Sequence, residues 1–314
     1  MRHVFLMVAC FLSISAVAQQ IEKFFDYNWK ECEVSAARFY SEIKKTDSGW
    51  HRDDYFVHDN VLQMDGTYED EACNIPNGLF FYFYSNKKVQ YTGKYVHGKK
   101  EGVWLSFHPN GAMADSSYFV HDEITGVHLS WYDNGFPSDS VNFNPDGSGI
   151  GFTWFDDGTP SSAGRYAAGK KMTGKWQFFY KSGKISSLET YNNGALINKE
   201  YYDEAANKMT DTSKGNSNAE FPGAENGWLK YLQKHLYFPP QYQITNADKA
   251  VDVITFTVNE DGSISNVFVY TPFYPEFDNI AVNVITRSPK WKPAINHNRP
   301  VKSQFKQAVT FSQE

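Results

Sequence analysis

Residues 102–125 read GVWLSFHPNGAMADSSYFVHDEIT, and altered copies of this stretch flank it on both sides. A glycine begins each copy, with spacings of 24, 24, 23 and 25 residues between Gly78, Gly102, Gly126, Gly149 and Gly174. A fixed period in this range indicates a repeat architecture in which each unit stacks on its neighbours. The middle of the chain is therefore predicted to be an array of short, similar units.

Aromatic residues fill two fixed positions in every unit. Five positions after the glycines stand Phe83, Phe107, Trp131, Trp154 and Phe179. Seventeen positions after them stand Tyr95, Phe119, Phe143, Tyr166 and Tyr191. Aromatics make up only 17% of the chain, so their presence in all ten positions reflects a repeated core and not chance. A sugar-stacking surface is the less favoured interpretation, because these rings are expected on the apolar face of each strand.

Each unit alternates apolar and mixed residues with a period of two, as a half-buried strand does. In one strand Val103, Leu105 and Phe107 alternate with Trp104, Ser106 and His108; in the next unit Val127, Leu129 and Trp131 alternate with His128, Ser130 and Tyr132. We expect the face with the valines and leucines to be the buried one. Turns such as Asp133-Asn134-Gly135 fold each unit into a hairpin, and stacked hairpins give one long antiparallel sheet.

Two units differ from the others at the ends of the array. In the last unit Lys175 and Gln177 replace the apolar pair, which is typical of a capping repeat. A weaker copy begins near His51, with Phe56 and Tyr68 in the aromatic positions. The predicted domains are therefore an N-terminal cap region at 19–50, a repeat array at 51–202, a polar linker at 203–220 and a C-terminal domain at 221–314.

The first 18 residues have the pattern of a secretory signal peptide. Arg2 supplies the positive charge, Val4 to Val17 the apolar segment, and Ala16-Val17-Ala18 the small residues of a cleavage site. The alternative is an uncleaved anchor, but the 15 residues of Val4–Ala18 span only about 22 Å of the ~30 Å hydrocarbon core. Export to the periplasm or cell envelope is expected. Cys32 and Cys73 then either form a disulfide or stay as two inert thiols.

The charge pattern excludes several classes of function. The chain of 314 residues has a net charge of −6 and no Lys/Arg cluster, so neither nucleic acid nor an anionic membrane is expected as a partner, and membrane association would run only through another protein. His97 and His121 are not expected to bind a metal, because neighbouring units would hold them too far apart to share one ion. Asp156-Asp157-Gly158 lacks the remaining acidic residues of a calcium-binding loop. No catalytic motif, cofactor or small-molecule substrate is inferred, and the chain is predicted not to be an enzyme.

The C-terminal residues predict a small α+β domain. Helical spacing covers Trp228 to Leu236 and Phe277 to Ile285, and Asn259-Glu-Asp-Gly262 joins two strands as a hairpin. A final strand covers Val301 to Phe311. The predicted fold class is thus a mostly β array of stacked antiparallel hairpins followed by a domain with one sheet and one helical layer.

Both parts resemble known families. The repeats resemble the variant MORN repeat, which implies a scaffold or binding surface. The matching stretches are Gly102-Val-Trp-Leu-Ser-Phe…Asn110-Gly111 and Gly174-Lys-Trp-Gln-Phe-Phe…Ser182-Gly183.

The C-terminal domain resembles the TonB C-terminal domain. The matching pieces, in chain order, are Phe221-Pro-Gly, Phe238-Pro239, Phe256-x-Val258-x-x-Asp261-Gly262-x-Ile264, Phe277-Asp278-x-x-Ala281, Pro289-Lys-Trp291-Lys-Pro293-Ala294, Pro300-Val301 and Val309-Thr-Phe311. Ala224 and Arg299 stand where that family usually has glycine.

The second resemblance implies a docking module. In that family the last strand offers an open edge to an extended segment of an outer-membrane transporter, by β-augmentation. The implied partner is such a transporter or another envelope protein. The implied process is transmembrane transport. The implied partner-binding edge is Val301, Ser303, Phe305, Gln307, Val309 and Phe311, with Lys302, Lys306 and Thr310 on the other side of the strand. The alternatives are a strand covered on both faces and a structural scaffold unrelated to transport.

Overall fold

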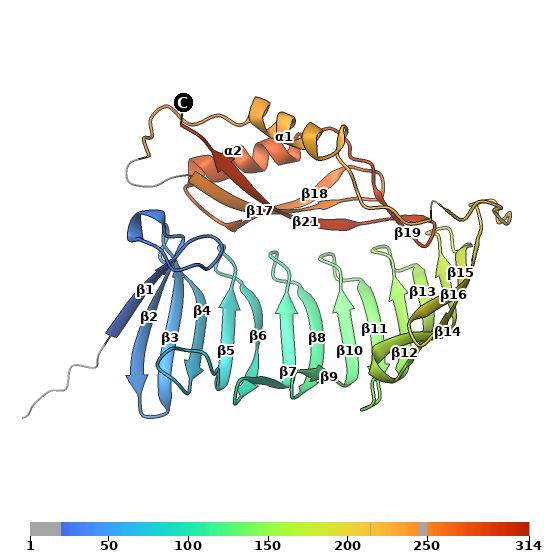
Figure 1. Cartoon of the computed structure of the whole chain (residues 1–314), viewed down its shortest axis with the longest axis horizontal. Helices are drawn as coiled ribbons and strands as arrows, with labels where there is room; N and C mark the ends of the chain where they lie inside the picture. The colour runs from blue at the N-terminus through green and yellow to red at the C-terminus, as the bar shows by residue number, and fades with distance from the viewer. Residues whose placement is uncertain (1–19, 214, 245–249, 314) are drawn as a thin grey trace, which may run out of the picture.

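The computed structural model describes residues 20–213, 215–244 and 250–313, and the predicted signal peptide lies outside them. A large sheet forms one body, and a small α+β domain lies along the edge of that sheet, above its turns (Figure 1). The predicted fold class and the order of the two parts are confirmed. None of the helices in the described ranges has the length and apolar character needed to cross a membrane.

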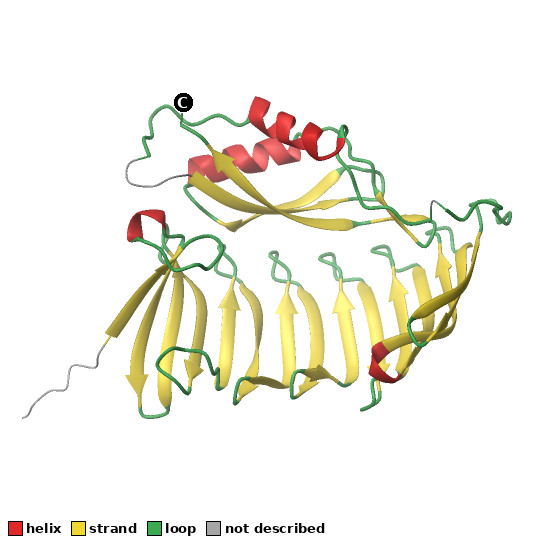
Figure 2. Ribbon diagram, in the orientation of Figure 1, coloured by secondary structure: helices red, strands yellow, loops and turns green. Residues whose placement is uncertain are grey.

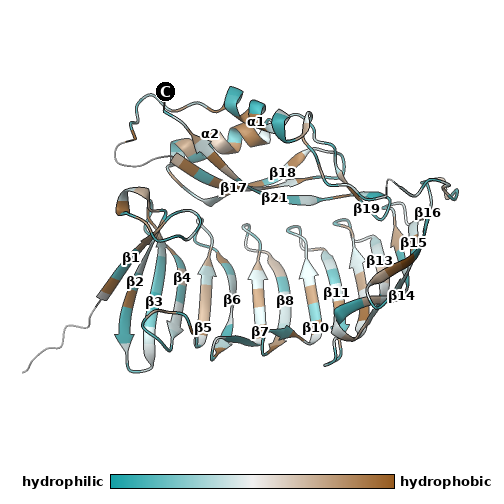
Figure 3. Cartoon of the chain, in the orientation of Figure 1, coloured by the Kyte–Doolittle hydropathy of each residue, from teal (hydrophilic) through white to brown (hydrophobic). Residues whose placement is uncertain are grey.

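The array is one antiparallel sheet of 16 strands, and nearly all of them are paired in chain order (Figure 2). Its strands are β1 (Gln20–Phe25), β2 (Phe39–Thr46), β3 (Gly49–Phe56), β4 (Val61–Tyr68), β5 (Gly78–Phe83), β6 (Val89–Val96), β7 (Lys99–Phe107), β8 (Met113–Val120), β9 (Glu123–Ile124), β10 (Gly126–Trp131), β11 (Pro137–Phe143), β12 (Gly149–Trp154), β13 (Pro160–Ala167), β14 (Lys171–Phe179), β15 (Ile185–Asn192) and β16 (Ala195–Tyr201). Short 3-10 turns lie at Val34–Ala36 and Ala168–Lys170. Strand β9 pairs only with β8. Hydrophobic segments recur along the array (Figure 3).

The buried face of the array is the opposite of the one expected. Trp104 is 4% exposed, whereas Val103 and Val127 are 56% and 53% exposed. The expectation was wrong because a period of two shows that a strand has two unlike faces without showing which of them a neighbouring strand covers. We call the side with Trp104 the inner face and the side with Val103 the outer face.

Rings packed on glycines decide which face is inner. A Cβ added to Gly93 would lie 2.1 Å from the ring of Trp104, and one added to Gly164 would lie 2.0 Å from that of Trp176. Each indole therefore lies flat against the backbone of the preceding strand, which only glycine permits. Trp176 occupies the same face as Trp104, so the last unit keeps the inner pattern and differs only on its outer face.

The segment before the repeats continues the same sheet. Strands β1 and β2 pair with each other, and β2 pairs with β3, so residues 20–46 form the first end of the array. Both cysteines carry free thiols in the structure: Cys32 is half-buried, and Cys73 is buried with Ile43, Met64 and Phe80. The disulfide weighed above is therefore not formed here, and Cys73 packs as a small apolar side chain.

The C-terminal domain has two helices on one face of a three-stranded sheet. Its elements are α1 (Ala224–His235), β17 (Ala250–Val258), β18 (Ile264–Thr271), α2 (Pro275–Thr286), β19 (Ala294–Asn296), β20 (Arg299–Val301) and β21 (Ser303–Phe311). The sheet has the order β18-β17-β21, and β19 pairs with β20 as a separate hairpin. Phe256, Phe277 and Ile285 are central in a core that also contains Trp228 and Trp291.

Candidate functional site

Strand β21 forms one edge of the C-terminal sheet. It pairs with β17 without a break, from Ala250 opposite Phe311 to Val258 opposite Ser303. Its side chains alternate between two environments. Phe305, Val309 and Phe311 belong to the core under the helices, whereas the remaining side chains of the alternation are exposed: Gln304, Lys306, Ala308 and Thr310.

The register shows which backbone groups of β21 point away from β17. The Asn259 N–H donates to the Ser263 carbonyl at 2.9 Å, so Asn259 bonds toward β18. Hydrogen-bonded and non-bonded pairs alternate along an antiparallel ladder, so the next residue, Val258, bonds toward β21. Its partner Ser303 therefore bonds to β17, and Gln304 points outward. The same alternation turns the backbone groups of Lys306, Ala308 and Thr310 away from the sheet.

Side-chain contacts agree with this assignment. The Ala308 carbonyl accepts a hydrogen bond from Gln307 Nε2 at 2.7 Å, as an outward carbonyl can. On the opposite edge, the Val269 carbonyl of β18 accepts from Ser85 Oγ of the array at 2.6 Å. Of the two edge strands, β18 is therefore held against the array. Among the described residues, the outward backbone groups of β21 make no hydrogen bond to another element, and only the Ala308 carbonyl is engaged, by the side chain of Gln307.

The residues expected to form the edge have their side chains on the core side of the strand. Val301 ends β20, and Ser303, Phe305, Gln307, Val309 and Phe311 direct their backbone groups to β17. Gln307 Oε1 accepts from Trp228 Nε1 at 3.1 Å. The edge implied by the resemblance lies on β21, but the backbone groups that point outward from this strand belong to its even-numbered residues. Only the register of the β17–β18 hairpin distinguishes the two sets.

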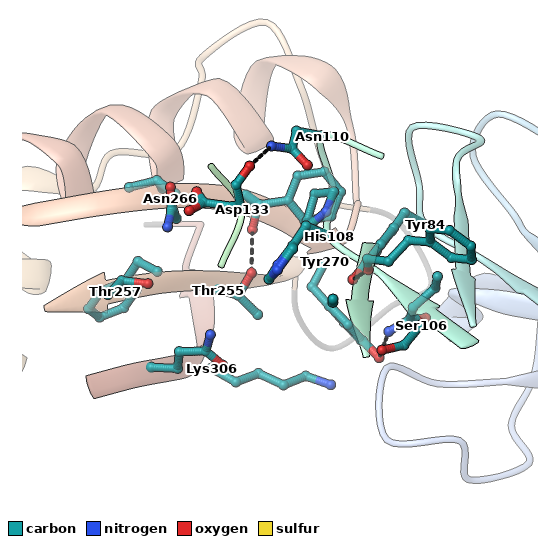
Figure 4. Close-up of a pocket in the computed structure, with 18 of the residues that line it drawn as sticks. Tyr84, Ser106, His108, Asn110, Asp133, Thr255, Thr257, Asn266, Tyr270 and Lys306 are labelled. Carbon is teal, nitrogen blue, oxygen red and sulfur yellow. Dashed lines mark hydrogen bonds between the residues drawn. The ribbon is translucent and has the colours of Figure 1, made fainter. Parts of the chain in front are cut away.

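A cleft of about 830 Å³ separates the sheet from the turns of the array (Figure 4). Tyr84, Tyr91 and His108 line it from the array, and Tyr270 and Lys306 line it from the sheet. The Lys306 ammonium lies 3.6 Å from the centre of the Tyr270 ring. Burial raises the pKa of Tyr84 to about 12, so its phenol stays neutral near pH 7 and donates to the Phe107 carbonyl at 2.8 Å.

A cluster of four charges lies at a second, neighbouring pocket, which Glu260 and Lys302 line. Asp156 accepts from Lys181 at 2.7 Å and from Lys302 at 2.5 Å, and Lys181 also lies 3.2 Å from Glu260. Burial pushes the pKa of Asp156 upward, but the hydrogen bonds from the two lysines outweigh it and lower that pKa. The cluster joins the array to the C-terminal domain beside the first residues of β21.

The tip of the β19–β20 hairpin fixes the domain to the array. Arg299 is 6% exposed, and its guanidinium donates to the carbonyls of Ser161 and Phe179 and, at 2.9 Å, to Ser161 Oγ. His297 stacks on Phe178 with 3.5 Å between the ring centroids. Burial lowers the pKa of Arg299 to about 10, so it stays charged at neutral pH.

Two other clusters of chemically active groups lie on the array. On the outer face, ligand atoms of His51, Asp53 and Asp65 lie within 4.8 Å of one another, a grouping that the sequence did not reveal because it joins two strands. On the inner face, His128 lies 2.9 Å from Ser117 Oγ and 3.3 Å from Asp115. The Ser117 hydroxyl donates to Asp115 at 2.7 Å, which directs its proton away from the imidazole.

Family comparisons support the assignment of both parts. Residues 234–312 match the family model described as Gram-negative bacterial TonB protein C-terminal. The C-terminal domain is thus similar to the TonB C-terminal family over most of its length. Residues 172–193, in the β14–β15 hairpin, match the MORN repeat variant, so MORN-type repeats precede the TonB domain. No curated protein matches the chain. The TonB domain supports a TonB-like protein of the Gram-negative envelope, and its family is one of non-enzymatic interaction domains.

Proposed function

We propose that this protein docks an extended segment of an envelope partner on the free edge of β21, by β-augmentation. The expected partner is an outer-membrane transporter that uses TonB-type proteins, or another protein of the envelope. The observation that carries the proposal is the outward direction of the backbone groups of Gln304, Lys306, Ala308 and Thr310, deduced from the register. Unpaired N–H and C=O groups on an edge strand are a template for an added strand.

The cleft gives such a docked strand a second contact surface. Gln304 and Lys306 line the cleft and alternate with the core-facing residues of β21. Because successive side chains of a strand point to opposite faces, every second side chain of an added strand would point toward the array. The aromatic rings of Tyr84, Tyr91 and Tyr270 then select partners whose side chains fit the cleft, and the array serves as a rigid support for the domain.

The test uses a proline at a position where only the outward N–H is lost. Ala308→Pro removes a donor that faces the partner but leaves the bonds to β17, and proline is tolerated on an edge whose N–H faces solvent. We expect this variant of the full chain to stay folded and to lose at least tenfold in affinity for synthetic peptides from the N-terminal segments of such transporters, measured by fluorescence polarisation.

Two controls make this experiment decisive. Ala308→Ser keeps the N–H and should bind the peptides like the unchanged chain. Amide chemical shifts of residues 303–311 should move on titration with a peptide that binds. The proposal fails if none of the transporter peptides shifts these amides, or if Ala308→Pro binds them as tightly as Ala308→Ser.

A further inference from the structure

The outer face of the array carries a continuous apolar surface. We define the outer stripe as its seven exposed large apolar residues, which are 37–61% exposed: Leu79, Phe81, Val103, Tyr118, Val127, Ile150 and Phe152. They lie on strands β5, β7, β8, β10 and β12 and form two parallel rows across the sheet. Contiguous exposed apolar surface of this kind marks a site of interaction, whereas isolated apolar residues do not.

The ladder pairs establish one of these rows residue by residue. Consecutive partners across the strands from β4 to β14 are Asp65, Phe81, Thr92, Leu105, Ser116, Leu129, Ser140, Phe152, Ala163 and Gln177. In this row large apolar side chains stand on β5, β7, β10 and β12, the first strands of their hairpins, and small or polar ones stand on the second strands; Tyr118, in the other row, is on a second strand. Strands lie about 4.8 Å apart, so apolar ridges alternate with grooves at a repeat of roughly 10 Å.

We propose that a second copy of this chain covers the outer stripe, with the two arrays packed face to face. The ridge spacing is set by the hairpin repeat, so a surface with the same spacing, displaced by one strand, places its ridges in these grooves. Another copy of the array meets this requirement along the row from β5 to β12. This pairing goes beyond partner docking on β21, because it uses the outer face of the sheet and not the edge with the turns that line the cleft.

Charges at the two ends of the stripe favour one orientation of the second copy. The row begins with four carboxylates on β1 to β4, beside Lys44 and His51: Glu22, Glu42, Asp53 and Asp65. The opposite end carries the exposed Arg165 and Lys175 on the outer face of β13 and β14. A two-fold axis parallel to the strands places the acidic end of each copy over the basic end of the other.

The size of the surface suits a stable dimer. Half-exposed side chains of this size each contribute on the order of 100 Å², so the stripe provides on the order of 700 Å² per copy, close to the ~800 Å² per partner of a standard interface. The same axis leaves both C-terminal domains along one edge of the dimer. Both β21 edges would then face the same side of the assembly.

Zero-length crosslinking of the unchanged full chain tests the arrangement directly. Carbodiimide activation should join Lys175 to Asp65 or Glu42, detected by mass spectrometry of the crosslinked dimer. Within one copy, β4 and β14 are nine strand spacings apart in the sheet order, roughly 40 Å, so this crosslink can form only between copies. Dimers without crosslinks between these ends would overturn the proposed orientation.

Variants test the apolar contact by sedimentation equilibrium. Val103→Lys with Val127→Lys should raise the dimer dissociation constant at least tenfold, and Asn226→Lys, at an exposed position of α1 away from the array, should leave it unchanged. Arg165→Glu with Lys175→Glu should weaken the dimer, and adding Glu42→Lys with Asp65→Lys should restore it. A chain that stays monomeric at about 100 µM overturns the proposal and leaves the stripe for a different partner.

Discussion

Asp252 is a buried carboxyl at the contact between the two domains. It is fully buried on β17, near Asp278 of α2 and Arg38 of the array. The guanidinium of Arg38 donates to the Val251 carbonyl at 3.3 Å and lies 4.3 Å from the Phe273 ring centre. Burial raises the pKa of Asp252, the charge of Asp278 raises it further, and Arg38 opposes the rise. The protonated carboxyl is therefore the form that the fold favours.

This shift predicts a pH-dependent stability. The pKa of this carboxyl is higher in the folded state than in the unfolded state, where it is about 4. Its contribution to the stability of the fold is therefore complete below about pH 4. This contribution is lost as the pH rises toward the pKa of the folded state. Asp252→Asn mimics the protonated form. The gain in melting temperature over the unchanged chain should therefore grow between pH 5 and pH 8, by a few °C.

Calorimetry at several pH values measures this gain. Asp47→Asn, at an exposed turn, is the control and should leave the melting temperature within about 1 °C of the unchanged chain at each pH. A difference between Asp252→Asn and the unchanged chain that stays constant with pH would contradict the assignment.

At the scale of the element, β21 combines two functions in one alternation. Its odd-numbered residues complete the core and bond to β17, and its even-numbered residues face outward. A shift of one residue in register would exchange these roles. The outward direction of the docking groups therefore depends on the packing of a few buried side chains, of which Phe311 is 2% exposed.

Truncating neighbouring residues of β21 should show this alternation. Phe311→Ala removes a ring that lies 5.0 Å from that of Phe277, and it should destabilise the domain by about 3–5 kcal/mol. Thr310→Ala, on the exposed side, should change its stability by no more than about 0.5 kcal/mol. Native-state hydrogen exchange of the β17 amides measures both. Similar losses for the two variants would mean that the register is different.

At the scale of the whole molecule, the linker and the side chains of the β19–β20 hairpin together fix the connection between the domains. Residues from 203 to 220 make bridges at both ends, Tyr202 with Lys208 and Glu220 with Lys292. Arg299, at a position where the TonB family usually has glycine, inserts its guanidinium between β13 and β14. The departure from the family pattern thus coincides with the contact that holds the domain on this array.

Arg299→Ala should loosen the domain without unfolding it. The carbonyls of Ser161 and Phe179 would lose a buried charged donor, which costs about 1–3 kcal/mol. Amide hydrogen exchange at residues 294–301 should become about tenfold faster or more. Arg287→Ala, an exposed arginine at the end of α2, is the matched control and should not change the exchange. Unchanged exchange in Arg299→Ala would show that the other contacts suffice.

The sequence by itself determined the repeat, the hairpins and the order of the two parts. These features depend on periodicity and turn chemistry, which are local properties of the chain. The C-terminal helices and the hairpin turn at Asn259–Gly262 were predicted for the same reason.

Only the tertiary structure decided which face of each strand is covered. Val103 and Trp104 are adjacent and both hydrophobic, and Trp104 is buried because Gly93 on another strand leaves room for its ring. Likewise, Ser303 and Gln304 have similar polar side chains, and the pairing with β17 alone determines which backbone points outward. Burial and hydrogen bonding depend on residues distant in sequence, so no local pattern could settle either assignment.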